Sequence, residues 1–298
     1  MRAPHTTPAS WPKTGPSRFA ARVQPDTSND RSIALIGVPD DTGVGMNHGR
    51  LGAAEGPSAF RAALARYGAA VPAGIAWPGV FDAGDVEPGS TLEETHERVT
   101  AAAGALLDAG LLPVMIGGGH DLTYPFVRAL AQRTETPLHG VYLDAHLDVR
   151  AETGSGMPFR RLVEDCGVRS LTVHGLDPFA NSTKHMTWFS GNGGRVGTLG
   201  PDEPSSWPAV DASGGSVFVS FDIDVLDQSV APGVSAMNPS GWSADLGCAW
   251  ARAAGRHASV RCFDIMELSP PHDEHGRTAR VAARLFLEFL AGFAERDA

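Results

Sequence analysis

Residues 141–150 read VYLDAHLDVR, and this stretch predicts both the type of fold and the type of site. The apolar run at 138–143 is typical of a buried β-strand, and it leads into Asp144, His146 and Asp148 at every second position. Because side chains alternate between the faces of a strand, these three potential metal ligands are expected to start on one side. The stretch therefore predicts a strand that ends at a metal-binding edge.

Other apolar segments indicate that strands alternate with helices along the chain. Further buried strands are expected at residues 32–38, 80–85, 111–116, 170–175, 217–221 and 260–266. Helices are expected to open at residue 56 and to span residues 91–109, 122–132 and 277–295, whereas residues 40–50 and 190–216 are expected to be loops. This alternation predicts a mostly parallel sheet with helices on both faces.

The chain of 298 residues is long enough for one large α/β domain. Residues 1–30 contain five prolines among Ser, Thr and Ala, which predicts an extended N-terminal arm, docked or mobile. No linker or internal repeat interrupts residues 31–298, so we expect a single domain there.

Charge and composition exclude several classes of protein. Lys and Arg total 24 against 34 Asp and Glu, and no basic run is present to bind the phosphates of a nucleic acid. The stretch 40–50 is rich in glycine but lacks the G-x-G-x-x-G spacing of dinucleotide-binding loops. The most apolar stretch, 101–119, is interrupted by Asp, Gly and Pro, so no membrane span is expected. Cys166, Cys248 and Cys262 lie far apart, which indicates reduced thiols and a cytoplasmic location.

Acids and histidines follow four of the predicted strands. In α/β folds of this type, ligands bind beyond the carboxyl ends of the strands. His120 follows the strand at 111–116, Asp222 and Asp224 follow 217–221, and Glu267 follows 260–266. Together with residues 144–148, four strand ends therefore bring four Asp, two His and one Glu to one edge.

The two His and four Asp side chains are too many for one Zn²⁺ in a site with three or four ligands, and no cysteine takes part. They suit two divalent ions, and the predominance of oxygen ligands favours Mn²⁺ over Zn²⁺. Two neighbouring ions can hold a bridging water with a pKa low enough to give a nucleophile near neutral pH. Each Asp alone could instead form a turn or cap a helix, but the joint occurrence of acids and histidines at four strand ends favours the metal site.

Three segments resemble signatures of the ureohydrolase family, which contains arginases, agmatinases and formimidoylglutamases: residues 118–120 (GGH), 144–148 (DAHLD) and 220–227 (SFDIDVLD). The resemblance implies a three-layer α/β/α sandwich around a mostly parallel sheet, with a binuclear manganese site. It implies that one ion is held by His120, Asp144, Asp148 and Asp222. The other is then held by Asp144, His146, Asp222 and Asp224, so that Asp144 and Asp222 bridge the two ions.

Further segments resemble the formimidoylglutamase branch. Arg150 follows the metal motif, and an Arg at this position suits a substrate carboxylate, although it could instead pair with a nearby acid. Residues 154–160 (GSGMPFR) resemble a Ser-Gly-Thr-Pro-Phe segment, with Ser155 where arginases and agmatinases typically have His and with Met157 in place of the usual Thr. The loop at 41–53, which includes Asn47, and residues 175–181 also fit this branch.

The resemblance predicts a hydrolase that converts N-formimidoyl-L-glutamate to L-glutamate and formamide, a step in histidine degradation, with two Mn²⁺ per subunit. Asp148 is expected to pass a proton to the departing nitrogen and Glu267 to hold the amidine nitrogens, with other substrate contacts from Arg150, Ser155, Gly156 and Asn47. One alternative is an amidinohydrolase that releases urea from a guanidino acid or an agmatine-like substrate. Another is a catalytically silent, metal-binding regulatory subunit. We expect a homo-oligomer that has no nucleic-acid or membrane partner.

Overall fold

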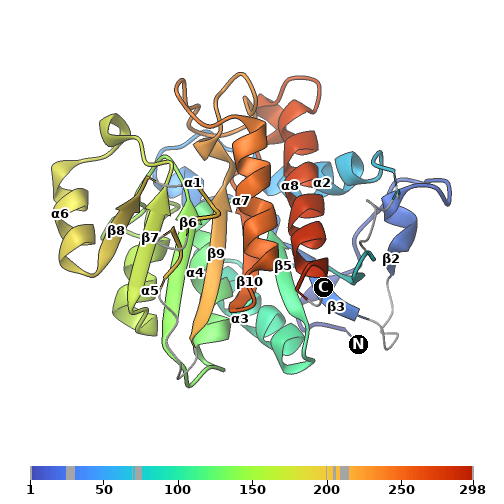
Figure 1. The fold of residues 1–298 in the computed structure, drawn as a ribbon, viewed down its shortest axis with the longest axis horizontal. Helices are drawn as coiled ribbons and strands as arrows, with labels where there is room; N and C mark the ends of the chain where they lie inside the picture. The colour runs from blue at the N-terminus through green and yellow to red at the C-terminus, as the bar shows by residue number, and fades with distance from the viewer. Residues whose placement is uncertain are drawn as a thin grey trace.

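The computed structural model of the chain describes residues 2–24, 31–68, 70, 76–198, 200–203, 206–208 and 215–296. Within these residues a single sheet of ten strands runs through the molecule (Figure 1). The strands are β1 (Thr6–Thr7), β2 (Val23–Gln24), β3 (Arg31–Gly37), β4 (Gly79–Val86), β5 (Leu112–Ile116), β6 (Leu138–Leu143), β7 (Ser170–His174), β8 (Gly194–Gly197), β9 (Ser216–Asp222) and β10 (Val260–Met266). Their spatial order is β1-β4-β3-β5-β10-β9-β6-β7-β8, with β2 also paired to β4.

Helices cover both faces of this sheet. They are α1 (Thr42–Met46), α2 (Gly56–Leu64), α3 (Leu92–Asp108), α4 (Thr123–Ala131), α5 (Pro158–Cys166), α6 (Thr183–Gly191), α7 (Ala244–Arg256) and α8 (Arg277–Ala294). One core joins α2, α7 and α8 to the sheet, and a second core on the opposite face joins α3, α4 and α5 to it (Figure 1). In β3, Ile33 and Leu35 belong to the first core, whereas Ala34 and Ile36 belong to the second. Residues 33–36 of this strand are all apolar because both of its faces are buried. The predicted three-layer α/β/α sandwich is confirmed.

The four central strands bring distant parts of the chain to one edge. Strands β5, β10, β9 and β6 are neighbours, and each pairs in parallel with the next. Strands β5 and β6 follow each other in the sequence but are not neighbours in the sheet. Strands β9 and β10, which come later in the chain, lie between them. The carboxyl ends of all four strands therefore meet at one edge of the sheet. Ligand sites in open α/β sheets form at such a change in strand order.

Two segments differ from the sequence prediction of loops. Residues 42–46 form the short helix α1, although two of its five residues are glycines. Buried Val44 anchors this helix, so tertiary packing outweighs its low helix propensity. Within 190–216, residues 194–197 form the edge strand β8, which pairs only with β7. Residues 199, 204–205 and 209–214 of that predicted loop lie outside the described residues.

The N-terminal arm lies against the edge of the sheet. Strand β1 pairs antiparallel with β4, and the Trp11 indole donates a hydrogen bond to Asp82 at 2.6 Å. The buried Phe19 ring packs edge-on against Phe286 of α8, with ring centroids 6.5 Å apart. Residues 2–24 therefore pack on the domain, whereas residues 1 and 25–30 of the predicted arm lie outside the described residues.

A buried ion pair fixes α2 to this edge, and its removal should destabilise the fold. Arg61, whose side chain is 2% exposed, donates to both carboxylate oxygens of Asp82 at 2.9 Å and to Asp85 at 2.6 Å. We expect Arg61→Ala to lower the free energy of unfolding by about 3–5 kcal/mol, because it leaves the buried Asp82 carboxylate without a positive charge beside it. Urea denaturation measures this change. Removal of the partly exposed Arg98, which pairs with Glu94 on α3, is the control and should cost less than about 1 kcal/mol; equal losses in both variants would contradict the prediction.

Candidate metal centre

The first group of potential metal ligands surrounds His120, which opens the 3-10 helix η3 (His120–Leu122) after the three glycines that follow β5. Its Nδ1 atom lies 3.2 Å from Asp144 Oδ2, 2.9 Å from Asp148 Oδ2 and 3.1 Å from Asp222 Oδ2. All three carboxylates thus approach the same ring nitrogen, and only the Asp148 side chain is appreciably exposed, at 16%. The ends of β5, β6 and β9 therefore converge on one point, as the sequence predicts.

A second group lies beside the first. His146 Nδ1 is 3.1 Å from Asp224 Oδ2 and 3.4 Å from Asp144 Oδ1. The ligand atoms of Asp144, His146 and Asp224 all lie within 4.8 Å of one another, as do those of the first group. Asp144 belongs to both groups, whereas Asp222 meets this limit only in the first. The structure thus brings all six predicted ligands together, and the bridging role of Asp222 stays a prediction.

The backbone that carries Asp144, His146 and Asp148 does not continue the strand. Strand β6 ends at Leu143, so the expected alternation of side chains across a strand does not apply to these residues. They converge because the loop curls: Asp148 has a left-handed backbone, with φ of 47°. Asn181 holds the loop in place, since its Oδ1 accepts from Leu147 N at 2.9 Å and its Nδ2 donates to Ala145 O at 2.9 Å. The sequence therefore predicted the correct cluster, although it assumed an extended strand where the chain forms a curved loop.

The two groups have the chemistry of a site for divalent cations. Buried polar atoms of three of these residues have no hydrogen-bond partner: His120 Nδ1, Asp144 Oδ2 and Asp224 Oδ1. Ligand atoms about 3 Å apart are what an octahedral ion with bonds of about 2.1 Å requires. Burial raises the pKa of Asp222 well above its usual value and also raises that of Asp224, while the Asp224 carboxylate raises the pKa of His146. The cluster therefore needs positive charge, and its oxygen-rich donor set fits ions of the Mn²⁺ type.

A buried network behind His120 fixes the orientation of its ring. His120 Nε2 lies 3.0 Å from Ser220 Oγ, and this hydroxyl donates to Asp264 Oδ1 at 2.5 Å. Thr123 Oγ1 donates to the other oxygen of Asp264 at 3.0 Å. Since the Ser220 proton goes to Asp264, Ser220 accepts the proton of His120 Nε2, and the lone pair on Nδ1 is left available to a metal ion. The sequence analysis gave no role to Ser220 or Asp264, although a polar residue inside a buried strand was a usable signal.

Loss of this network should weaken metal binding. We expect Asp264→Asn to reduce the affinity for Mn²⁺ by about 10-fold to 100-fold, because partners behind a metal ligand typically contribute that much. Calorimetric titration of the metal-free protein with Mn²⁺ measures the effect. Thr172→Val, which removes a buried hydroxyl on β7 outside the cluster, is the control. An affinity within twofold of the unaltered protein would show that Asp264 does not orient His120.

Glu267 lies directly beyond β10, with one carboxylate oxygen fixed and the other free. Its Oε1 accepts from the backbone N–H of His120 at 2.9 Å, whereas its buried Oε2 has no hydrogen-bond partner. The residue has a left-handed backbone, with φ of 65°. Burial raises its pKa to about 8. The free oxygen can accept an N–H from a bound cation such as an amidinium, and the role of Glu267 in holding the amidine nitrogens stays a prediction.

Four of the six predicted ligands and all of the predicted substrate residues line one cavity of about 140 Å³. One wall carries acidic and metal-ligating groups: His146, Asp148, Asp222, Asp224 and Glu267. The remaining lining residues carry no acid: Asn47, Gly49, Arg150, Ser155, Gly156, Ser235 and Ala236. All of the predicted substrate contacts lie on this cavity, whereas Gly49, Ser235 and Ala236 were not predicted. Within the part of the chain that the structure describes, no carboxylate forms an ion pair with Arg150, so its guanidinium is available to a ligand.

Comparison with known proteins agrees with this geometry. Residues 31–292 match the model of the arginase family. The chain belongs to the arginase family. This match confirms the ureohydrolase resemblance that the sequence motifs indicate.

Among its relatives, this arginase-family protein is 36% identical to the formimidoylglutamase of Ralstonia nicotianae over 291 residues, which cover 90% of this chain and 87% of the relative. It is similar to the crystal structure of Trypanosoma cruzi formiminoglutamase with Mn²⁺, with a TM-score of 0.84, 32% identity and coverage of 94% of this chain and 99% of that one. It is also similar to the proclavaminate amidino hydrolase of Streptomyces clavuligerus, with a TM-score of 0.79, 28% identity and coverage of 92% and 96%.

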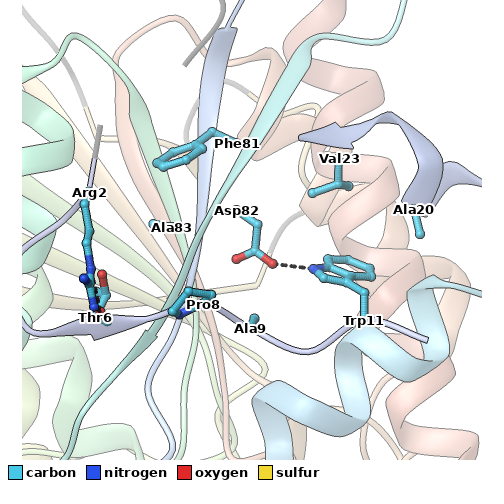
Figure 2. Close-up of a pocket in the computed structure, with 10 residues that line it drawn as sticks. All are labelled: Arg2, Thr6, Pro8, Ala9, Trp11, Ala20, Val23, Phe81, Asp82 and Ala83. Atoms are coloured by element: carbon cyan, nitrogen blue, oxygen red, sulfur yellow. Dashed lines mark hydrogen bonds between the residues drawn. The ribbon is translucent and has the colours of Figure 1, made fainter. Parts of the chain in front are cut away.

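A second cavity of this arginase-family protein, of about 410 Å³, lies under the N-terminal arm (Figure 2). Its one carboxylate, Asp82, points toward Trp11 in Figure 2 and accepts the hydrogen bond from the indole. Arg61 and the backbone N–H of Gly84 engage the same carboxylate. Since these partners already satisfy Asp82, the larger cavity offers no free reactive group. The candidate for chemistry is the smaller cavity at the metal centre.

Proposed function

We propose that this protein hydrolyses N-formimidoyl-L-glutamate to L-glutamate and formamide, a step in histidine degradation, and that it uses two Mn²⁺ per subunit. The observation that carries the proposal is the unpaired Arg150, which lines the same cavity as four of the six predicted metal ligands, His146, Asp148, Asp222 and Asp224. An Arg guanidinium binds a carboxylate through two parallel hydrogen bonds, so this cavity suits an amidine that also carries a carboxylate. The similarity to formimidoylglutamases supports the choice of amidine.

The residues of the site have separate roles in the proposed reaction, and the first role is to bind the ions. His120, Asp144, Asp148 and Asp222 would hold one ion, and Asp144, His146, Asp222 and Asp224 the other. Two such ions, when bound, lower the pKa of a shared water far enough to provide a nucleophile near neutral pH.

The remaining roles belong to the substrate contacts. The free oxygen of Glu267 accepts an amidinium N–H and holds the formimidoyl carbon in place. Arg150 binds a carboxylate of the glutamate, with Asn47, Ser155 and Gly156 beside it. Asp148, which lines the cavity, carries a proton to the departing nitrogen.

A substrate panel tests this proposal. The Mn²⁺-loaded protein should release formamide from N-formimidoyl-L-glutamate and should release little urea from 4-guanidinobutyrate or agmatine. The similarity to proclavaminate amidino hydrolase makes a guanidino acid the second candidate substrate. Urea release from 4-guanidinobutyrate without formamide release from the first substrate would overturn the proposal. Inactivity on every amidine, with two ions bound, would instead favour a regulatory subunit.

We further propose that residues 31–298 form one catalytic domain of a cytoplasmic homo-oligomer, with a small-molecule substrate and no nucleic-acid or membrane partner. The family match over residues 31–292 supports one domain. The three cysteines form no disulfide, which agrees with a reducing compartment. Among the described helices, none is long and apolar enough to cross a membrane. Light scattering of the purified protein tests the oligomeric state.

A further inference from the structure

The proposed substrate carries two carboxylates, but the cavity offers one guanidinium. Among its lining residues Arg150 is the only Lys or Arg. With two ions bound, the metal ligands are already engaged, and the Glu267 carboxylate offers no donor to a second carboxylate. The second carboxylate therefore needs neutral hydrogen-bond donors on the wall that carries no acid. The identity of the residue that provides these donors is inferred below, and the inference rests on the proposed function.

Arg150 and its neighbours form one part of that wall. Arg150 N donates to Gly156 O at 2.8 Å, and Gly156 N donates to Asn47 Oδ1 at 2.8 Å. The Arg150 side chain lies directly on Gly156, where an added Cβ would be 2.8 Å from Arg150 Cδ. Arg150, Ser155 and Gly156 thus belong to one compact loop and form the subsite for the first carboxylate.

Ser235 reaches the cavity from a different loop, which connects the 3-10 helix η6 (Ile223–Val225) to α7. Its hydroxyl oxygen accepts a hydrogen bond from the backbone N–H of Arg50 at 2.8 Å. The hydroxyl proton is therefore free to be donated to a ligand in the cavity. Ser235 is the one hydroxyl donor that lines the cavity from outside the Arg150 loop and the loop of Asn47.

Arg50 holds this loop in position. Its Nε donor is used in that contact and is therefore not available to the substrate. Its Nε donates to Ser235 O at 2.9 Å, and its Nη2 donates to Val234 O at 2.6 Å. The base of the loop is also anchored, since Gly233 N donates to Thr278 Oγ1 at 2.8 Å and Gly233 O accepts from Ser269 N at 2.7 Å. The Ser235 hydroxyl is thus presented by a loop whose backbone is fixed at both points.

We propose that Ser235 is a specificity-determining residue that donates a hydrogen bond to the substrate carboxylate not held by Arg150. Arg50 is a positioning residue that holds Ser235 in place through three hydrogen bonds. Together they select a dicarboxylic amidine over a monocarboxylic one.

Steady-state kinetics with three substrates test this proposal in the Mn²⁺-loaded protein. The substrates are N-formimidoyl-L-glutamate, 4-(formimidoylamino)butanoate, which lacks the α-carboxylate, and N-formimidoyl-L-norvaline, which lacks the side-chain carboxylate. Ser235→Ala should lower kcat/KM for the glutamate substrate by about 10-fold to 100-fold, the value of a hydrogen bond to a charged group. It should lower the ratio of kcat/KM for the glutamate substrate to kcat/KM for one of the two monocarboxylic analogues by the same factor; this ratio is the preference. Arg150→Met should instead lower the ratio taken against the other analogue.

Matched variants separate substrate binding from a general loss of structure. Ser240→Ala, a neighbour on the same loop that does not line the cavity, should change neither preference. Arg50→Ala should change the same preference as Ser235→Ala, with partial recovery in Arg50→Lys, while the content of two ions stays intact. The Ser235 assignment is overturned if Ser235→Ala leaves both preferences within about twofold, or if it abolishes the same preference as Arg150→Met. If the unaltered protein releases no formamide from any of the three substrates, the proposed function itself fails, and this assignment with it.

Discussion

Asp144→Asn should abolish catalysis and leave the protein with fewer than two ions per chain. Asp144 is the one side chain that belongs to both ligand groups, and it is completely buried. An amide in its place removes a negative charge that both ions share. We expect kcat to fall by more than about 100-fold, since substitutions behind a metal ligand already cost 10-fold to 100-fold. Metal analysis of the dialysed protein and a formamide assay measure the two effects.

A nearby acid provides the control for Asp144. Asp227 lies in the same SFDIDVLD segment, but its carboxylate accepts hydrogen bonds from Ser229 at the surface and takes no part in either ligand group. Asp227→Asn should therefore keep both ions and most of the activity. If Asp144→Asn retains two ions and more than a tenth of the activity, Asp144 does not bridge the ions.

The sequence predicted which acids and histidines cluster, because these residues are chemically distinctive and follow buried strands. The order of strands did not have to be known, since parallel strands place all their carboxyl ends at one edge. What the sequence could not provide was the local path of the chain at Asp148. Its left-handed backbone is imposed by the surrounding loop contacts, such as those of Asn181 with residues 145 and 147.

Helix α7 shows why part of the fold was not predicted from apolar periodicity. Much of its buried face consists of small residues, with Trp250 as the large exception. Such residues allow the backbones of α7 and α8 to approach closely: an added Cβ on Gly255 would lie 2.0 Å from Phe289 O, and one on Gly292 would lie 1.9 Å from Arg252 O. A helix that packs through small residues lacks the large apolar side chains on which hydrophobic periodicity depends. Ser235 was not predicted either, because a serine in a loop becomes a candidate substrate contact only when the residues across the cavity are known.

Arg150→Met should raise KM for N-formimidoyl-L-glutamate by about 100-fold or more and leave the two ions in place. Methionine keeps much of the length of the side chain but offers no charge and no hydrogen-bond donors. A guanidinium that binds a carboxylate through two parallel bonds loses the whole interaction in this variant, and removal of one partner of such a pair commonly costs 2–5 kcal/mol. Because Arg150 belongs to neither ligand group and pairs with no acid of the described chain, metal content should not change.

Arg150→Lys separates the contribution of charge from that of geometry. Lysine keeps the positive charge but cannot form the planar pair of hydrogen bonds, so KM should lie between the values of the unaltered protein and the Met variant. Agmatine, which has no carboxylate, provides the complementary substrate, since neither variant should bind it more weakly than the unaltered protein does. An unchanged KM for N-formimidoyl-L-glutamate in Arg150→Met would show that Arg150 does not bind the substrate. The two carboxylates would then both depend on neutral donors such as Ser235, and the choice of a dicarboxylic substrate would lose its electrostatic basis.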